Sequence, residues 1–372
     1  MKAWFSSIGQ RITDDVRNWW DAEDGVSYDR FFLTLLAIVL CVGFVMVSSA
    51  SMPVAERLYH DPLHYATRHL FYLGIGLTCA YVVLNIPIEW WHRTNMVLLV
   101  LGLLALIAVL AIGRNVNGST RWIALGPINI QAAEPAKLFF FVYLSSYLVR
   151  KHEEVLEHLK GFLKPLVILF AFAVLLLMQP DLGTVIVMFS TSVVLLFLAG
   201  AKLWQFFGLI ITGLAAIGVL IVYSAYRWKR VTSYLDPWKD PFGGGYQLTQ
   251  SLMAFGRGGW NGQGLGNSVQ KLEYLPEAHT DFIFAIIAEE TGLLGVFSVM
   301  LMLFLLVVRA LWIGKRALQK GLSFHGFLAY ALGIWIGFQT FVNIGVASGV
   351  LPTKGLTLPF VSYGGSSLII ML

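Results

Sequence analysis

Charged side chains are scarce in this sequence. They make up 13% of its 372 residues, whereas 57% of the residues are hydrophobic, and the mean hydropathy is +0.72. Because a soluble globular domain carries roughly a quarter charged residues, this composition excludes an ordinary soluble protein. The net charge of +5 is small and lies in the segments between apolar runs, so we expect no nucleic-acid binding. The composition predicts a membrane protein with many spans.

Cysteine and nucleotide-binding motifs are also nearly absent. Cys41 and Cys79 both lie inside apolar runs, where a thiol acts as a small apolar side chain. They provide neither a disulfide framework nor a metal-binding spacing. No G-x-x-x-x-G-K-[ST] motif occurs, and this motif forms the loop that holds nucleotide phosphates. Transport driven by a nucleotide is therefore not expected.

Long apolar runs, in contrast, follow one another along most of the chain. A run of about 20 apolar residues is long enough to cross a bilayer. We predict an all-α integral membrane protein, in which a polar N-terminal tail, with no cleaved signal peptide, precedes a single membrane domain, 31–372. The tenth run is too short to cross, and we expect that the sequence stops within that helix. The ten predicted transmembrane helices are 31–51, 69–88, 95–113, 134–149, 163–179, 182–200, 203–226, 282–308, 325–350 and 359–372.

Lysine and arginine predict the orientation, because cytoplasmic loops are rich in them. A cytoplasmic N-terminal tail, 1–30, gives the inner segments many more of these residues than the short outer loops. One long segment, 227–280, is expected outside although it is basic. It either binds an anionic ligand or is a long loop that crosses regardless of charge. Its cations are Arg227, Lys229, Arg230, Lys239, Arg257 and Lys271.

Charged residues within predicted spans are costly in a bilayer, so each is a candidate functional residue. Glu134 and Lys137 open the span 134–149 with i, i+3 spacing, which places both on one helix face and predicts an ion pair. The pair is either an anchor at the membrane interface or part of a binding site. In the second interpretation Lys137 attracts an anionic ligand, and Arg121 in the preceding outer loop adds another cation.

A second cluster precedes the span 282–308. Asp281 lies at the outer start of this apolar run, with Glu277 and His279 just before it. A carboxylate at the boundary between water and an apolar environment is suited to act as a general base. The alternative is that Thr280 or Asp281 only caps the helix.

Other charges lie near this cluster in the sequence. Arg230, Arg257 and Lys271 belong to the same predicted outer layer and would stabilise a phosphate leaving group. Glu289 and Glu290 lie about two turns into the span and have no assigned role. They require water, a cation or a basic partner on a neighbouring helix.

Two further segments interrupt the apolar pattern. Gln179, Pro180 and Asp181 predict a turn in which Asp181 caps the next helix. The segment 350–369, VLPTKGLTLPFVSYGGSSLI, contains prolines and glycines that indicate a broken or re-entrant backbone lining a cavity. Ser362 would supply a hydroxyl group to that cavity. The alternative is ordinary helix packing by small residues.

Taken together, several motifs resemble the SEDS (shape, elongation, division and sporulation) family of peptidoglycan glycosyltransferases. The resemblance covers nearly the whole chain, and the wording of 250–282 and 351–365 is more similar to division-type than to elongation-type members. The motifs are NGSTRWI (117–123), AAEPAKL (132–138), QPDLGT (179–184), LDPWKDPFGGGYQ (235–247), LEYLPEAHTDFIFAIIAEETG (272–292) and LPTKGLTLPFVSYGGSS (351–367).

The resemblance implies a ten-span enzyme that polymerises lipid II at the division septum, on the outer face of the bacterial inner membrane. The 4-hydroxyl of the acceptor sugar attacks C1 of the donor with inversion, and undecaprenyl pyrophosphate leaves. By motif, Asp281 is the general base, as the Asp of the family's HTDF sequence. Lys137 and Glu134 match the charged pair of the family's central cavity, and Arg121 matches its outer-loop arginine.

The resemblance also implies partners: a class B penicillin-binding transpeptidase (FtsI-like) and regulators of the FtsQ, FtsL and FtsB type. No cofactor is certain; a divalent cation, Mg²⁺ or Mn²⁺, would assist the leaving group, although no set of ligands in the sequence specifies it. The competing functions are an elongation-type polymerase, a lipid II flippase that uses the same cavity, and a non-catalytic scaffold for division proteins.

Overall fold

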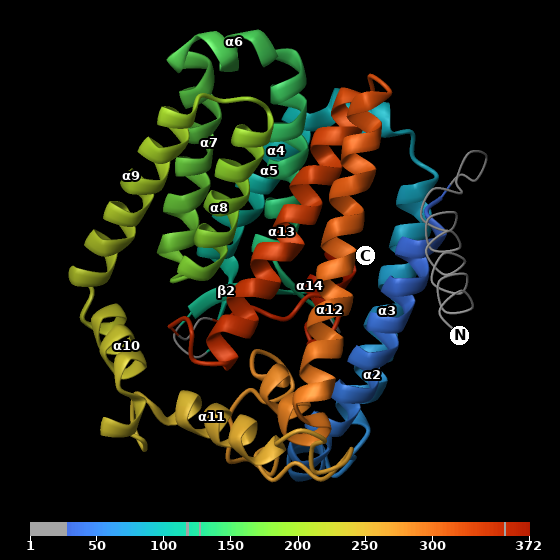
Figure 1. The fold of residues 1–372 in the computed structure, drawn as a ribbon, viewed down its shortest axis with the longest axis vertical. Helices are drawn as coiled ribbons and strands as arrows, with labels where there is room; N and C mark the ends of the chain where they lie inside the picture. The colour runs from blue at the N-terminus through green and yellow to red at the C-terminus, as the bar shows by residue number, and fades with distance from the viewer. Residues whose placement is uncertain (1–27, 117–118, 126–127, 353–354) are drawn as a thin grey trace, which may run out of the picture.

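Helices make up most of this protein. The structure is a computed structural model that describes residues 28–116, 119–125, 128–352 and 355–372. Figure 1 shows long helices aligned roughly with the longest axis. The α-helices are α2 (Arg30–Tyr59), α3 (His64–Leu84), α4 (Ile88–Ile112), α5 (Ala133–Arg150), α6 (His152–Glu157), α7 (Leu159–Met178), α8 (Leu182–Leu198), α9 (Leu203–Val222), α10 (Ala225–Leu235), α11 (Tyr246–Gly258), α12 (Ile283–Gln319), α13 (Ser323–Ala347) and α14 (Gly365–Met371).

Each of the ten predicted spans overlaps one long helix or, for the last, the short helix α14. Within the described residues, seven helices are long and apolar enough to cross a membrane: α2, α3, α4, α7, α9, α12 and α13. Helix α8 is apolar but shorter, and α5 carries the predicted charges Glu134 and Lys137. The protein is thus a multi-pass membrane protein, and the exact number of spans stays a prediction.

Several predicted boundaries differ from the helix ends: α2 continues to Tyr59 rather than 51, and α4 begins at Ile88 rather than 95. Helix α12 continues to Gln319, beyond the predicted end at 308, and its backbone leaves helical geometry at Gly292 (φ 67°, ψ −165°). The last predicted span begins late, because residues 355–364 are irregular and only Gly365–Met371 is helical. Pro359 and the two glycines at 364 and 365 account for this, since they do not favour helix.

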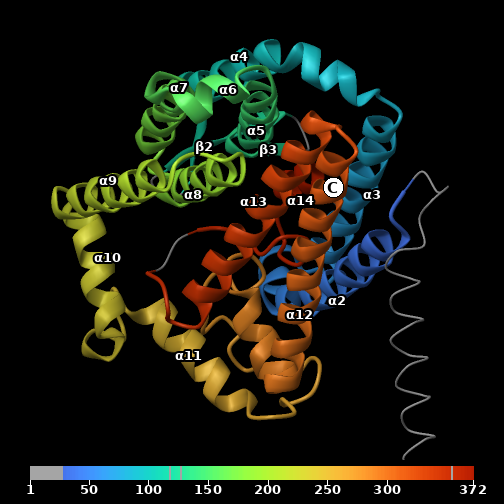
Figure 2. The same cartoon turned by 45° about the horizontal axis from the view of Figure 1, so that its top comes forward.

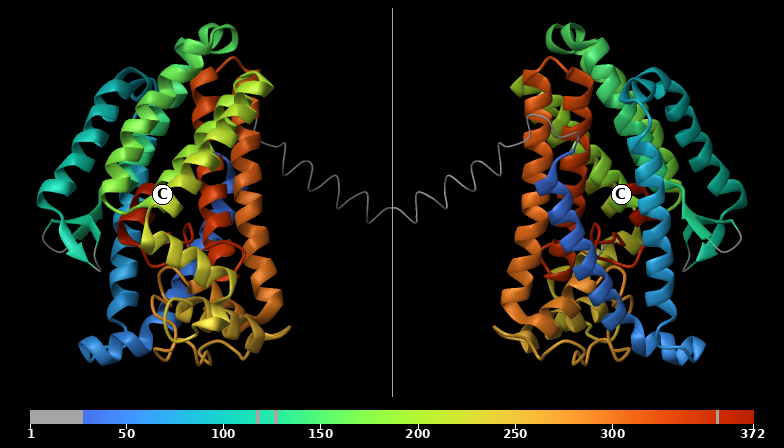
Figure 3. Two further views of the ribbon diagram at one scale, coloured as in Figure 1. Left: turned by 90° about the vertical axis from the view of Figure 1, so that its left-hand side faces the viewer. Right: turned by 90° about the vertical axis from the view of Figure 1, so that its right-hand side faces the viewer.

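A small sheet lies before α5, in the segment that we predicted as an outer loop. Three strands, β1 (Arg114–Val116), β2 (Ser119–Leu125) and β3 (Ile128–Gln131), pair antiparallel in the order β1-β2-β3. The register places Trp122 opposite Gln131 and Ile123 opposite Ile130. The β-branched and aromatic residues of these short segments favour strands. Figure 3 shows the sheet at the side of the helices, below α4.

The long segment 227–280 is likewise partly ordered as helix. It contains most of α10, the 3-10 helix η1 (Pro237–Lys239) and α11. Figure 1 places α11 at one end of the long axis and α6, which joins two predicted inner helix ends, at the other. The orientation prediction requires this separation, and which end faces outward stays a prediction.

Helices α5 and α13 lie in the interior of the fold. Thirteen residues of α5 are buried, including Glu134 and Lys137, and α13 contacts α12, α8 and α5. Figure 2 shows α13 between the group α4 to α9 and the group α2, α3 and α12. Helix α9 is the opposite case, since Gln205 is its one buried residue among those described.

The segment before α14 enters this interior as irregular backbone. Leu356, Leu358 and Phe360 are buried there, as the predicted broken backbone requires. Helix α2 approaches it closely at Gly43, where a Cβ atom would lie 2.5 Å from the carbonyl oxygen of Phe360. A glycine is therefore needed at this contact.

Candidate active site

Asp281 lies in the turn that leads into α12. Helical geometry begins at Ile283, with Phe282 at the N-cap position, and the Phe282 side chain makes no capping hydrogen bond. Thr280 instead donates to the side chain and the backbone carbonyl of Glu277. Asp281 is half-buried, and the residues that follow it are buried. Its carboxylate thus lies where the surface of the protein meets its core.

The backbone at residue 355 brings the Asp281 carboxylate and the Arg121 guanidinium to one place. A Cβ atom built on Gly355 would lie 3.1 Å from Oδ2 of Asp281 and 3.9 Å from Nη1 of Arg121. The side-chain amide of Asn343 supports this arrangement, because it donates to the carbonyl oxygens of Asp281 (2.9 Å) and Leu356 (2.6 Å). An anionic group and a cationic group therefore face the same point from different elements.

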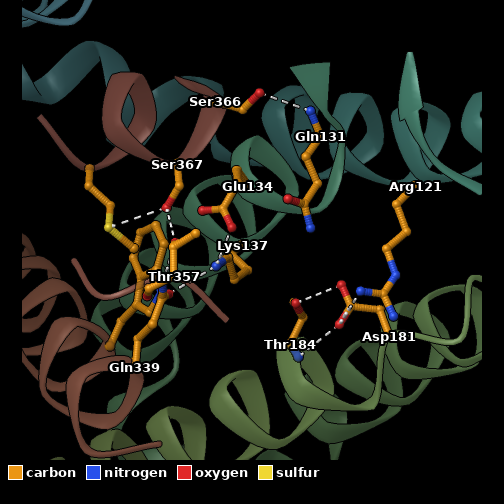
Figure 4. Close-up of polar contacts among 12 residues, drawn as sticks. Arg121, Gln131, Glu134, Lys137, Asp181, Thr184, Gln339, Thr357, Ser366 and Ser367 are labelled. Atoms are coloured by element: carbon orange, nitrogen blue, oxygen red, sulfur yellow. Dashed lines mark hydrogen bonds and ion pairs between the residues drawn. The ribbon is translucent and has the colours of Figure 1, made fainter. Parts of the chain in front are cut away.

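Arg121 is held by the predicted turn at residues 179–181. Its Nε donates to the carbonyl of Gln179 (3.1 Å), and its Nη2 donates to the carbonyl of Pro180. Its Nη1 lies 4.0 Å from Oδ1 of Asp181. Asp181 also accepts from the backbone and hydroxyl of Thr184, which confirms its predicted role as the cap of α8. Figure 4 shows Arg121 extended from β2 toward this turn.

Glu134 and Lys137 form the predicted ion pair, with Nζ and Oε1 at 2.9 Å. The pair is not an anchor at the surface, because the Lys137 side chain is 0% exposed and that of Glu134 is 4% exposed. Lys137 also donates to Oε1 of Gln339 (3.2 Å) and lies 4.8 Å from the ring centre of Trp335. Oε2 of Glu134 is buried and has no hydrogen-bond partner among the described residues. A buried acceptor of this kind is available to a ligand or water.

A chain of polar side chains continues from Lys137 to the last helix. Gln339 donates to the carbonyl of Thr357 (3.1 Å), and the Thr357 hydroxyl donates to Ser367 (3.1 Å). Figure 4 shows these side chains grouped together, with Thr357 below Ser367 and Gln339 lowest. The sequence interpretation did not single out Gln339 and Asn343 as site residues. Two amide side chains four residues apart in a predicted span do indicate polar contacts inside the membrane.

His279 packs among aromatic rings. Its ring centre lies 4.7 Å from that of Tyr65 and 5.7 Å from that of Tyr363, and the Tyr363 amide donates to its carbonyl (2.9 Å). Burial lowers the pKa of His279, and the nearby Glu277 partly opposes this shift. His279 and Glu277 therefore shape the turn that carries Asp281.

The other predicted binding residues have partners elsewhere. Lys271 is buried and pairs with Glu290 (2.7 Å), and Arg257 approaches Glu289 at 3.5 Å. Of the three alternatives for these two acids, the structure therefore shows basic partners, although Lys271 lies in a loop rather than on a helix. Both cations therefore pair with glutamates in the structure, and their contact with a leaving group stays a prediction.

Ser362 holds its own turn, since its hydroxyl accepts from the amide of Leu358 (2.8 Å). The helical backbone at Arg230 is described, but its side chain lies outside the described part. Within the described residues, no group of three or more His, Cys, Asp or Glu side chains could hold a metal ion. These residues therefore form no protein cage for the expected Mg²⁺ or Mn²⁺.

Comparison with known proteins identifies the family. Residues 29–372 match the family model of FtsW, RodA and SpoVE, described as cell cycle proteins. The chain belongs to this family, which is the SEDS family that the motifs indicated.

Similar proteins include two bacterial relatives, each named "Probable peptidoglycan glycosyltransferase FtsW". The relative from Pseudoalteromonas atlantica is 62% identical over 344 residues, which cover 92% of this chain and 71% of the relative. The relative from Escherichia coli O6:H1 is 52% identical over 371 residues, which cover 100% of this chain and 87% of the relative.

Two solved structures share the fold. One is a chain from a study of how a peptidoglycan synthase complex coordinates polymerization and crosslinking (30% identity, TM-score 0.75, 93% of this chain and 94% of that chain). The other is the rod shape determining protein RodA of Thermus thermophilus (28% identity, TM-score 0.68, 94% of each chain).

Proposed function

We propose that this protein is a peptidoglycan glycosyltransferase of the division type, which polymerises lipid II into glycan strands. The observation that carries the proposal is the convergence of the Asp281 carboxylate and the Arg121 guanidinium on the backbone of Gly355. A base and a cation at one point are what transfer of a sugar from a pyrophosphate requires. The names of the relatives from P. atlantica and E. coli support the same activity.

In the proposed reaction, Asp281 accepts the proton of the acceptor's 4-hydroxyl group as its oxygen attacks C1 of the donor. The bond between C1 and the pyrophosphate oxygen breaks, with inversion at C1, and undecaprenyl pyrophosphate leaves with the electron pair. Arg121 stabilises the developing negative charge, since a guanidinium makes strong charge-assisted hydrogen bonds to phosphate. Lys137 and Glu134 bind polar groups of the substrate from the interior side.

We place the protein in the bacterial inner membrane at the division septum, with Asp281 on the periplasmic side. The expected partner is a class B penicillin-binding transpeptidase (FtsI-like), with FtsQ, FtsL and FtsB as regulators. The similarity to a chain of a peptidoglycan synthase complex supports a partner that crosslinks the product. A stable assembly with such a partner would couple the two steps.

The test is a polymerisation assay with purified lipid II and the detergent-solubilised complex of this protein with its transpeptidase. Wild type should produce glycan strands, and Asp281→Ala should abolish them while keeping the thermal stability of the complex. Asp61→Asn is a matched control, because Asp61 is an exposed acid in the turn after α2 and should leave the rate unchanged. A near wild-type rate for Asp281→Ala would remove the base assignment, and transport of lipid II across vesicles without polymer would favour the flippase.

A further inference from the structure

Helix α12 consists of two helical pieces that meet at Gly292. The first piece, 283–291, begins two residues after Asp281 and is almost entirely buried. The segment 259–264 fills the interruption between the pieces. Backbone amides donate across it in both directions: Gln263 to Glu289 (2.9 Å), Gly264 to Glu290 (3.0 Å), Leu293 to Gly259 (2.9 Å) and Leu294 to Trp260 (3.2 Å).

The close fit between the loop and the helix leaves no room for a side chain at two glycines. A Cβ atom on Gly262 would lie 2.1 Å from the carbonyl oxygen of Glu290, and one on Gly258 would lie 1.9 Å from that of Ala288. Gly262 also has a positive φ of 77°. The first piece of α12 is therefore locked to the loop rather than carried rigidly by the long second piece, because the interruption breaks the helical hydrogen bonds between them.

Side-chain contacts also join the first piece of α12 to the loop that follows α11. The Glu289 carboxylate makes the first set of these contacts. It is 0% exposed and accepts from the amides of Val269 (3.0 Å) and Gln270 (3.2 Å) and from the hydroxyl of Ser268. Arg257 adds its charge at 3.5 Å. A buried carboxylate requires such donors, and their number fixes its orientation.

The Glu290 carboxylate makes the second set of contacts. It is 1% exposed, accepts from Lys271 Nζ at 2.7 Å and from the Ser49 hydroxyl at 2.8 Å, and so joins the loop to α2. Ser268 connects the two sets of contacts, because its hydroxyl also accepts a hydrogen bond from the amide of Lys271 (3.2 Å).

We propose that Glu289 and Glu290 are positioning residues for Asp281. The proposal rests on the proposed function. The two acids fix the far end of the short buried piece whose near end carries Asp281. A shift or rotation of this piece therefore displaces the carboxylate from the point that it shares with Arg121. Neither glutamate touches the substrate in this assignment; both act through the placement of Asp281.

The main test compares two isosteric variants of α12 contacts in the transpeptidase complex. Glu289→Gln weakens the hydrogen bonds between the loop and residue 289, which lies before Gly292. Asp29→Asn weakens a buried ion pair on the other side of the interruption, where Asp29 contacts Arg309 at 2.5 Å, and asparagine retains the capping of α2. Glu289→Gln should lower kcat for lipid II polymerisation about 10- to 100-fold, since a base misplaced by about 1 Å costs this much, with KM close to the wild-type value. Asp29→Asn should lower the melting temperature but retain kcat per folded molecule.

A wild-type kcat per folded molecule in Glu289→Gln, or an equal loss in Asp29→Asn, would overturn the assignment. If Glu289→Gln does not fold, Ser268→Ala provides the test. It removes one hydrogen-bond donor to Glu289 and leaves the Glu289 carboxylate buried. A fall in kcat at unchanged KM then supports positioning, and a wild-type kcat overturns it. Wild-type complex that forms no polymer would overturn the proposed function itself, which separates the two failures.

Discussion

The side-chain amide of Asn343 donates a hydrogen bond of 2.9 Å to the backbone carbonyl of Asp281. The same nitrogen donates to the carbonyl of Leu356 at 2.6 Å. One residue of α13 thereby joins the turn that carries Asp281 to the irregular segment before α14. Because these two segments together form the point where Asp281 and Arg121 converge, Asn343 holds the two sides of the candidate site together.

We expect Asn343→Leu to reduce polymerisation strongly. Leucine has a similar volume but no donor, so both carbonyl groups lose a buried hydrogen bond, at a cost of about 1–3 kcal/mol each in stability. The loss of alignment should lower kcat by about 10- to 100-fold. Initial rates with lipid II, normalised to folded protein, measure the effect.

The control for Asn343 is Thr212→Val on α9. Thr212 is exposed, and its hydroxyl donates to the carbonyl of Gly208 in its own helix. It should leave kcat unchanged. If Asn343→Leu retains the wild-type kcat, the alignment of the two segments does not depend on this amide.

The buried pair of Glu134 and Lys137 gives a prediction that separates stability from activity. Lys137→Met leaves the Glu134 carboxylate buried without its cation, which should destabilise the protein by about 3–5 kcal/mol. The double variant Glu134→Gln, Lys137→Met removes both charges and should recover much of that loss, because replacing a buried ion pair is often close to neutral. Thermal unfolding in detergent measures this.

Activity should behave differently in the same two variants. Both lack the ammonium group, so both should polymerise lipid II poorly even where the double variant is stable. If the double variant recovers activity together with stability, the pair has only a structural role and does not contribute to substrate binding.

Local interactions explain which parts of the site could be predicted from the sequence. The ion pair of Glu134 and Lys137 depends on i, i+3 spacing within one helix, and the cap formed by Asp181 depends on the next turn. Both follow from short-range rules. The apolar runs likewise predicted most helices, because about 20 apolar residues can span a bilayer whatever their neighbours are.

Long-range contacts explain what could not be predicted. Lys271 was interpreted as a cation for the leaving group, but it pairs with Glu290 on α12, 19 residues further along the chain, and no periodicity reveals that contact. Gln339 depends on Lys137 and Thr357, which come from other elements. The short strands were missed because segments this short carry little periodic signal.

Buried His279 leads to a prediction about pH. Burial among the rings of Tyr65 and Tyr363 lowers its pKa from 6.5 in the folded protein, although Glu277 partly opposes the shift. As the pH falls through 6.5 the unfolded chain therefore binds the proton first, and folding stability is lost until the pH passes below the folded pKa.

His279→Phe keeps an aromatic ring and removes the titrating group, so its melting temperature should fall less than that of wild type between about pH 7.5 and about pH 5.5. The matched control is His158→Phe, because His158 is exposed between α6 and α7, and this variant should follow wild type. An equal fall in His279→Phe and wild type would show that protonation of His279 does not contribute to acid destabilisation.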